Sequence, residues 1–316
     1  MKFCTFSHPA RGSGINGLGR PGVLTSDGAF IVDLGEVFPD ILSIIKGGDE
    51  AKAKARALQE KAEIRVPLSE AKLHAPVPVP EQIRDSMLFE KHVQQAMERI
   101  AIMRKPILGP LLVKLGMIKV APTWYQIPIY YKSNRFSVNG PDGDVVWPRY
   151  SQVMDFELEF GFFLGKGGKN IKASEARDHI FGFTIFNDFS ARDAQSIEMQ
   201  SMLGPCKGKD FDTGNSMGPF LVTLDEIGDP YNLRMQARVN GETWCDSNSS
   251  TIHHTFEDLL ARVSADETVH AGEFFGSGTV GDGCGLEHGR YLKDGDVVEL
   301  EVEKIGILRN RVVRQK

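Results

Sequence analysis

The sequence predicts an α+β protein in which a small N-terminal α/β unit precedes a larger, mixed, β-rich part. Three observations lead to this prediction. Short segments with strand-like patterns dominate the chain after about residue 128. A proline-rich stretch separates the N-terminal region from the rest. The composition, 41% apolar and 25% charged over 316 residues, provides ample material for a hydrophobic core.

The N-terminal region carries signals for strands, a hairpin and one helix. Residues 2–6, "GVLTS" and "AFIVDL" are typical of strands, and Asp27-Gly28 between the last two is typical of a hairpin turn. The charged, Ala-rich stretch 49–64 predicts a surface helix. In "LHAPVPVPEQI", three prolines at alternate positions enforce an extended connector. We therefore predict two domains, at residues 1–75 and 76–316.

The larger part begins with a predicted helix over 85–103, followed by a segment broken by Pro and Gly at 105–128. Period-2 alternation and short apolar runs then predict a series of strands. These strands cover 128–138, 155–164, 180–187, 218–223, 233–240, 270–276 and 296–313. Many short strands with scattered helices indicate a mixed fold.

Charge and composition exclude several classes of protein. The net charge is -5 and no Lys/Arg block resembles a nucleic-acid footprint, so we expect no nucleic-acid partner. No targeting segment or membrane span is recognised, which predicts a cytoplasmic protein without a membrane partner. The four cysteines are spread out with no CxxC pair, so we expect reduced thiols (Cys4, Cys206, Cys245 and Cys284).

The stretch "MDFELEFGFFLG" has acidic residues at alternate positions. Asp155, Glu157 and Glu159 share one face of the predicted strand, and aromatic residues occupy the other. This acidic face either meets water or lines a pocket that holds a cation. Two unit charges about 4 Å apart repel by about 4 kcal/mol at an effective dielectric constant of about 20, so a buried carboxylate cluster needs a cation or bound protons.

Other carboxylates favour the second alternative. The strand "IFGFTIFND" ends at Asp188, and strand ends commonly carry functional groups. Asp85 lies seven residues before His92 in "DSMLFEKH". Ligands that are all oxygen atoms favour a hard ion such as Mg²⁺, Mn²⁺ or Ca²⁺ over Zn²⁺.

At residues 80–313 the chain resembles the fumarylacetoacetate hydrolase superfamily. The motifs that carry the resemblance occur in the family order: "DFELEFGFFLGK", "GFTIFNDFSARDAQ", "LGPCKGKDFDT", "GSGTVGDGCGLE" and "GDVVELEVEKIGILRNRV". The resemblance implies a mixed β-roll catalytic domain, a small N-terminal domain as in longer members, and a homodimer. It also implies that a divalent metal is bound by Asp85, Glu157, Glu159 and Asp188, whereas Asp155 is structural.

The resemblance further implies that His92 is a catalytic base and that Glu287 is its partner carboxylate. We call these two residues the His92–Glu287 pair. A carboxylate beside an imidazole fixes its tautomer and stabilises the imidazolium. Glu90 is the alternative partner, although residues two apart on a helix point to different faces. Shorter family members carry their glutamate three residues after the histidine, where this chain has Gln95. Lys209 corresponds to the family lysine that holds the developing oxyanion or enolate.

Four residues match family positions that contact the substrate: Tyr131, Arg192, Gln195 and Thr279. Arg192 could instead pair with Asp193 or Glu198. The family's namesake has a tyrosine two residues after the first metal-binding Asp, where this chain has Met87. The loss of that hydroxyl argues against fumarylacetoacetate itself as the substrate.

These residues predict a metal-dependent hydrolase that cleaves a C–C bond in a β-diketo acid, such as an acylpyruvate. In this scheme the metal stabilises the enolate that leaves, and His92 activates water. The alternative reactions are decarboxylation, isomerisation, or lyase or dehydratase chemistry on a 2-oxo or sugar acid through the same enolate. A non-catalytic, metal-stabilised binding protein is a further alternative from a different class.

Overall fold

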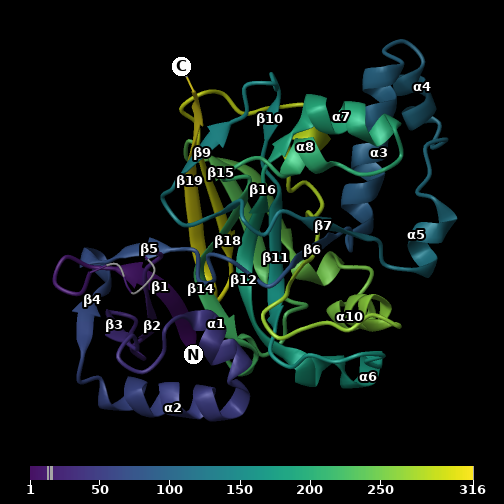
Figure 1. The fold of residues 1–316 in the computed structure, drawn as a ribbon. Coiled ribbons are helices and arrows are strands. Elements are labelled where there is room, and N and C mark those ends of the chain that lie inside the picture. Colours follow the sequence, from purple (N-terminus) through teal and green to yellow (C-terminus); the bar gives the residue numbers. More distant parts are fainter. Residues whose placement is uncertain (13, 15–16, 316) are drawn as a thin grey trace.

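The computed structural model describes residues 1–12, 14 and 17–315. Its largest sheet has twelve strands, and its main path runs in the order β4-β3-β2-β1-β14-β12-β11-β17-β6-β7 (Figure 1). The N-terminal strands therefore continue the same sheet as the later ones. This sheet comprises β1 (Lys2–Ser7), β2 (Arg20–Leu24), β3 (Phe30–Asp33), β4 (Arg65–Pro67), β5 (Lys72–His74), β6 (Ile83–Ser86), β7 (Tyr130–Ser133), β8 (Val138–Asn139), β11 (Leu158–Leu164), β12 (Ile180–Asp188), β14 (Asn215–Thr223) and β17 (Phe274–Gly276).

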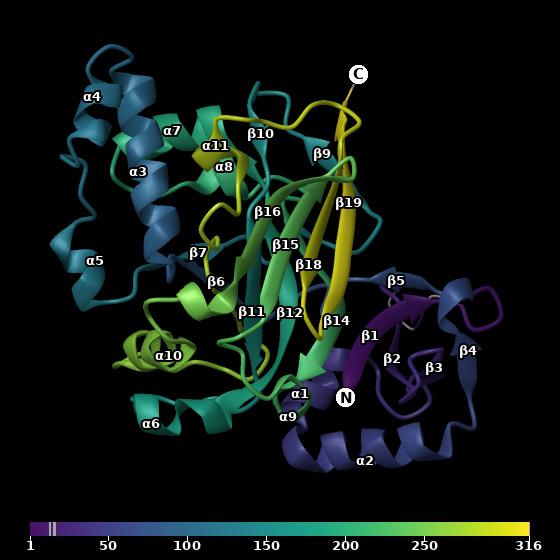
Figure 2. The same cartoon turned by 180° about the vertical axis from the view of Figure 1, so that it is seen from behind.

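A second sheet of five strands packs against the central strands of the first, as Figure 2 shows from behind. Its order is β16-β15-β18-β19-β9, and the core between the sheets is rich in phenylalanine. Its strands are β9 (Asp144–Trp147), β15 (Arg234–Val239), β16 (Glu242–Asn248), β18 (Val297–Val302) and β19 (Gly306–Arg314). The short strands β10 (Met154–Asp155) and β13 (Ser190–Ala191) form a separate pair.

The helices lie at the ends and edges of these sheets (Figures 1 and 2). They are α1 (Ile41–Lys46), α2 (Gly48–Lys61), α3 (Glu90–Arg104), α4 (Gly109–Lys114), α5 (Pro122–Gln126), α6 (Ala173–Ala176), α7 (Arg192–Gln200), α8 (Cys206–Lys209), α9 (Leu224–Ile227), α10 (Phe256–Ser264) and α11 (Gly285–His288). Single 3₁₀ turns occur at Leu68–Glu70, Arg177–His179 and Ser249–Thr251. Within the described ranges, no helix is long and apolar enough to cross a membrane.

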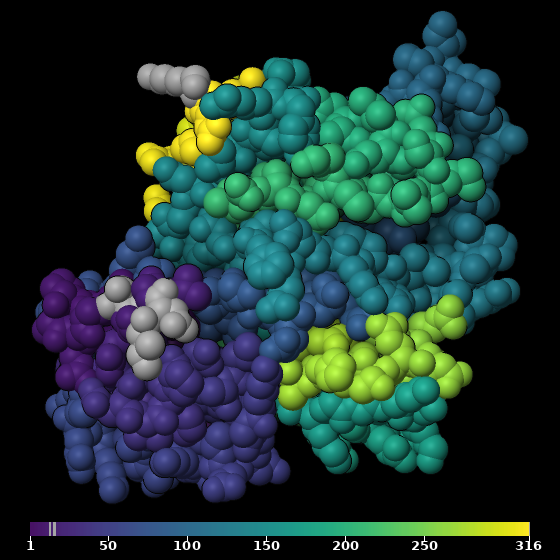
Figure 3. All heavy atoms as spheres, viewed as in Figure 1, coloured from purple at the N-terminus to yellow at the C-terminus, as the bar shows by residue number. Residues whose placement is uncertain are grey.

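The N-terminal residues form a lobe at one corner of the molecule (Figure 3). Strand β1 pairs with β14 through Lys2↔Val222 and Phe3↔Leu221. One hydrophobic cluster joins residues of this lobe to Phe163, Phe181 and Met217 of the larger part. The lobe and the larger part therefore share a sheet and a core, and the division at residue 75/76 stays a prediction.

Two predicted elements differ from the structure near the acidic residues. The predicted helix over 85–103 begins only at Glu90, and Asp85 lies on β6 instead, where it pairs with Tyr131 of β7. The predicted strand over 155–164 is interrupted after Asp155 and resumes at Leu158. The mixed α+β architecture expected from the sequence is confirmed.

Candidate active site

Three of the predicted metal ligands meet on three strands of the large sheet. Asp85 lies on β6, Glu159 on β11 and Asp188 at the end of β12. All three side chains are buried, and one carboxylate oxygen from each lies within 4.8 Å of the others. We call these residues the carboxylate trio.

Strand β17 lies between β11 and β6 and leaves space for the trio, because it places Gly276 there. A Cβ atom at Gly276 would stand 2.3 Å from Asp85 Oδ1 and 3.4 Å from Glu159 Oε2. Any side chain at this position would therefore push into the carboxylates. Gly276 is the first glycine of "GSGTV", and it is the sequence signal for this space. The sequence does not show that the side chains of Asp85 and Glu159 lie against it.

The trio fits a divalent cation with oxygen ligands. Three buried oxygens, Asp85 Oδ1, Glu159 Oε2 and Asp188 Oδ1, have no hydrogen-bond partner within the described part of the chain. Buried polar atoms in folded proteins are almost always paired, so three orphaned acceptors in one place indicate a missing partner with positive charge. Carboxylate oxygens are the ligands that Mg²⁺, Mn²⁺ and Ca²⁺ prefer.

The electrostatics of the trio agree with this interpretation. Burial, followed by the charge of Asp85, raises the pKa of Glu159 well above its usual value. Burial also raises the pKa of Asp85. In Asp188, burial outweighs the nearby charge of Lys209 and raises the pKa to about 7. Without a cation, the trio must hold protons at neutral pH.

Glu157 lies outside the trio and is paired with two cations. Its Oε2 is 2.5 Å from Lys209 Nζ, and its Oε1 is 2.8 Å from Arg192 Nη1. Although burial alone would raise the pKa of Glu157, these two charges lower it to about 2. Its predicted role as a metal ligand stays a prediction.

Lys209 connects Glu157 to the trio. Its Nζ also lies 2.7 Å from Asp188 Oδ2, and its side chain is 3% exposed. The charges of Asp188 and Glu157 outweigh the effect of burial and raise the pKa of Lys209, so the amine stays cationic. The structure thus places Lys209 between Glu157 and the trio, and its predicted role in holding an oxyanion or enolate stays a prediction.

The two residues of the predicted His92–Glu287 pair also lie in contact. His92, in the first turn of α3, places Nδ1 3.0 Å from Glu287 Oε1, and both side chains are largely buried. Glu287 Oε2 accepts a hydrogen bond of 2.9 Å from the backbone N–H of Cys284, the N-cap of α11. The other two positions considered lie elsewhere, because Glu90 accepts from Tyr125 and Gln95 donates to Asp282.

The four predicted substrate contacts lie around the same site. Tyr131 donates a hydrogen bond to Asp188, and Thr279 Oγ1 lies 3.3 Å from Glu159 Oε1. Arg192 is held by Asp155 and Glu157 and donates to Gln195 Oε1 at 3.0 Å. Asp193 and Glu198, the alternative partners of Arg192, accept hydrogen bonds from other groups.

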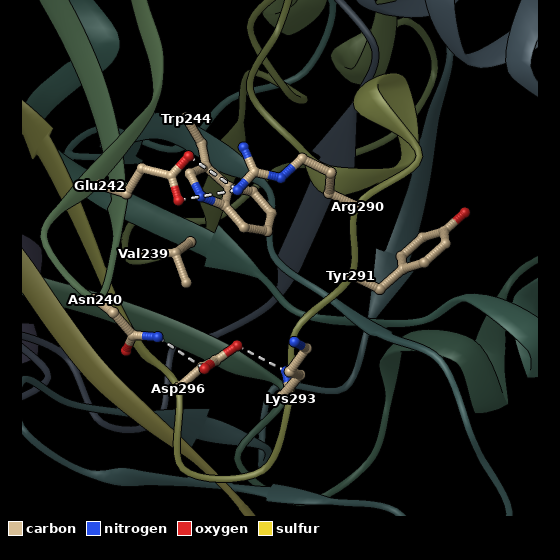
Figure 4. A pocket seen from close by; sticks show the side chains of 8 residues that line it. All are labelled: Val239, Asn240, Glu242, Trp244, Arg290, Tyr291, Lys293 and Asp296. Atoms are coloured by element: carbon tan, nitrogen blue, oxygen red, sulfur yellow. Dashed lines mark hydrogen bonds and ion pairs between the residues drawn. The ribbon is translucent and has the colours of Figure 1, made fainter.

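A pocket of about 430 Å³, which none of these residues lines, lies between strands β15 and β16 and the segment 290–296 (Figure 4). Several of its polar side chains already have partners. Arg290 stacks on Trp244 and forms an ion pair with Glu242 at 2.9 Å. Asp296 accepts hydrogen bonds from Asn240 and from the backbone of Lys293. Among the described residues, the pairs Arg290–Glu242 and Asn240–Asp296 therefore take up much of the polar lining of this pocket.

Residues 91–313 match the family model described as fumarylacetoacetate (FAA) hydrolase C-terminal. The human protein "Oxaloacetate tautomerase FAHD2B, mitochondrial" is 41% identical over 189 residues, which is 59% of this chain and 59% of that protein. "Oxaloacetate tautomerase fahd2, mitochondrial" of Xenopus laevis is 32% identical over 301 residues, covering 93% of this chain and 86% of that protein. A solved fumarylacetoacetate hydrolase from Exiguobacterium antarcticum has a similar fold, with a TM-score of 0.76, 24% identity and full coverage of both chains.

Proposed function

The chain belongs to the fumarylacetoacetate hydrolase family, and from this premise we propose a divalent-metal-dependent enzyme that transfers a proton in a small 2-oxo acid. The proposed reaction is the keto–enol tautomerisation of an oxaloacetate-like acid. One observation carries the proposal: Glu157 lies between the His92–Glu287 pair and a buried carboxylate trio suited to a cation, since it is bridged to Cys284 on one side and joined through Lys209 to Asp188 on the other. The names of the similar tautomerases point to the same substrate class.

The proposed ion is Mg²⁺, with Mn²⁺ or Ca²⁺ as alternatives. Asp85, Glu159 and Asp188 would hold it, and Glu157 is the proposed fourth ligand. When bound, such an ion would supply Lewis-acid chemistry that makes the CH₂ group next to the keto carbon of the substrate more acidic.

His92 performs the proton transfer in this proposal. A carboxylate can only accept hydrogen bonds, so Glu287 selects the tautomer in which Nδ1 carries the hydrogen and Nε2 is a free acceptor. Nε2 takes a proton from the CH₂ group and returns it to the keto oxygen, which gives the enol. The ammonium group of Lys209 offsets the negative charge that develops on oxygen between these two steps.

Hydrolysis of a C–C bond, the reaction expected from the sequence, is the second candidate. The His92–Glu287 pair supports it as well, because the same Nε2 can take a proton from water instead of from carbon. The hydroxide then adds to the distal carbonyl of an acylpyruvate, and the bond to the adjacent CH₂ breaks. The released fragment takes up a proton to become pyruvate.

A substrate panel separates the candidates. Purified, Mg²⁺-loaded protein is mixed with enol-rich oxaloacetate, with acylpyruvates and with 3,5-diketo acids, and the loss of each substrate is followed by absorbance and NMR. The proposal expects accelerated enol–keto exchange of oxaloacetate without C–C cleavage. Cleavage of an acylpyruvate would favour the second candidate. Metal binding without turnover of any member would contradict both and favour a binding protein.

The assembly and location of the protein are also proposals. We propose a homodimer, which light scattering of the purified protein would test, and no nucleic-acid or membrane partner. A cytoplasmic location stays our proposal, although the names of the vertebrate relatives include the word mitochondrial.

A further inference from the structure

Helix α11 carries Glu287 but is only four residues long. Isolated helices much shorter than about 12 residues do not hold their shape in water, so neighbouring groups must fix this turn. A small rotation of α11 would move the Glu287 carboxylate away from His92 Nδ1. The contacts that hold α11 therefore decide whether the His92–Glu287 pair forms.

The side chain of Asp155 supplies these contacts. It is completely buried, and it comes from β10, about 130 residues earlier in the chain. Its Oδ1 accepts from the backbone N–H of Gly285 at 2.7 Å, and its Oδ2 accepts from that of Leu286 at 2.9 Å. These two N–H groups belong to the first turn of α11 and would otherwise lack a partner.

The same carboxylate is tied to the centre of the site. Asp155 Oδ2 accepts from Arg192 Nε at 2.8 Å, and Arg192 Nη1 lies 2.8 Å from Glu157 Oε1. A backbone contact joins Glu157 to α11 directly, because Glu157 forms a β-bridge with Cys284, the residue that caps α11. The segment between β10 and β11 that bears Glu157 and the helix that bears Glu287 are thus joined through Asp155 and Arg192.

We propose that Asp155 is a positioning residue for the His92–Glu287 pair. It fixes α11 against the segment that bears Glu157, and so sets the direction from which Glu287 meets His92. The catalytic part of this inference rests on the proposed function, since it assumes that His92 transfers the proton. The geometric part, the control of the His92 tautomer through Glu287, does not depend on the reaction.

Replacement of Asp155 by Asn tests the proposal with little change in volume. The carboxylate accepts four N–H groups, two on each oxygen, from Phe156, Gly285, Leu286 and Arg192. An amide has only one acceptor oxygen, so in either orientation its NH₂ group faces two donors. At least two of these contacts are lost, and α11 must shift or Arg192 must leave.

A matched control is Asp33→Asn. Asp33 is also a buried carboxylate, held by Arg11 and Arg20 and by the backbone N–H of Gly35, but it lies on β3 in the N-terminal lobe. Both substitutions remove a charge from a buried ion pair, and both should lower the melting temperature. Only Asp155→Asn should affect the site.

Two measurements separate positioning from a merely structural role. In Mg²⁺-loaded protein with ¹⁵N-labelled histidine, two-bond ¹H–¹⁵N spectra report which ring nitrogen of His92 carries hydrogen, with the signals assigned by their absence from His92→Asn. We expect Nδ1 to be protonated in the wild type and in Asp33→Asn, and a mixture of tautomers in Asp155→Asn. If Asp155→Asn does not fold, Asp155→Glu, which keeps the charge but displaces the oxygens, should show the same mixture.

The second measurement is kcat with the best substrate of the panel above. Asp155→Asn should lower kcat by about 10- to 100-fold, whereas Asp33→Asn should change it less than about twofold. Because Asp155 acts through Glu287, the double variant Asp155→Asn/Glu287→Gln should match Glu287→Gln within about twofold. An unchanged His92 spectrum in the folded Asp155 variant, or losses that multiply in the double variant, would overturn the proposal. If no substrate is turned over, the proposed function fails and the spectra alone decide the positioning role.

Discussion

The carboxylate trio and the two cations beside it carry unequal charge. Asp85, Glu159 and Asp188, together with Glu157 and Asp155, could bring five negative charges, whereas the ion pairs of these groups within the described residues bring two positive charges, from Lys209 and Arg192. Burial makes this surplus unfavourable, and the raised pKa values of the trio express it. A divalent ion would remove most of the surplus.

Metal binding at neutral pH should therefore release protons. The pKa of Asp188 is raised to about 7 and that of Glu159 lies well above its usual value, so the metal-free trio holds protons that the ion must displace. Apparent affinity for Mg²⁺ should rise as the pH increases through about 7. Isothermal titration in buffers of different ionisation enthalpy measures the released protons. The variant Glu159→Gln should release fewer protons and bind more weakly. Binding heat that is independent of the buffer would show that the trio is not the site.

Lys209 should contribute to rate more than to metal binding. The substitution Lys209→Met keeps the stem but removes the cation, so kcat should fall by roughly 10²–10³. The exposed neighbour Lys207, changed in the same way, is the control and should leave kcat unchanged. A loss of tenfold or less in Lys209→Met would demote this lysine to a structural partner of Glu157 and Asp188.

At the scale of elements, strand β17 makes room for the carboxylate trio because it has no side chain at Gly276. In Gly276→Ala, the new methyl group would meet Asp85 Oδ1 at 2.3 Å, and the carboxylate must move. We expect the dissociation constant of Mg²⁺ to rise by at least about tenfold while the fold is retained. In the control Gly165→Ala, the added atom lies 3.1 Å from Phe181 and meets no carboxylate. Equal metal affinity in both variants would contradict the role given to Gly276.

Sequence reasoning located most elements but not the contacts between them. The strands around Glu159 and Asp188 follow from their apolar runs, and the structure confirms both. Edge strand β16, "ETWCDSN", was missed because its exposed face gives it no clean alternation. The helix predicted from residue 85 begins later, since Asp85 pairs with β7 and tertiary contacts override local preference. The link from Asp155 to α11 joins residues about 130 apart, and no local pattern reports such a contact.

At the scale of the whole molecule, the N-terminal lobe supports the sheet that bears the site. Strand β1 covers one edge of β14, and the shared core includes Phe163, Phe181 and Met217. Deletion of residues 1–75 would expose these side chains and the free edge of β14. We expect the fragment 76–316 to be insoluble or to melt at least about 10 °C lower than the full chain. A soluble fragment with an unchanged melting temperature and metal affinity would show that the lobe is an independent domain.

The central claim is that a divalent ion and His92 act together on the proton of a 2-oxo acid. The most direct measurement is the rate of enol–keto exchange of oxaloacetate with wild-type protein and with His92→Asn, each with Mg²⁺ and after exhaustive treatment with EDTA. The claim predicts that EDTA abolishes the wild-type rate and that Mg²⁺ restores it. It also predicts that His92→Asn binds Mg²⁺ normally but loses about 10²–10⁴ in rate, the usual contribution of a general base. A wild-type rate that survives metal removal, or a metal-loaded His92→Asn rate within about tenfold of wild type, would contradict it.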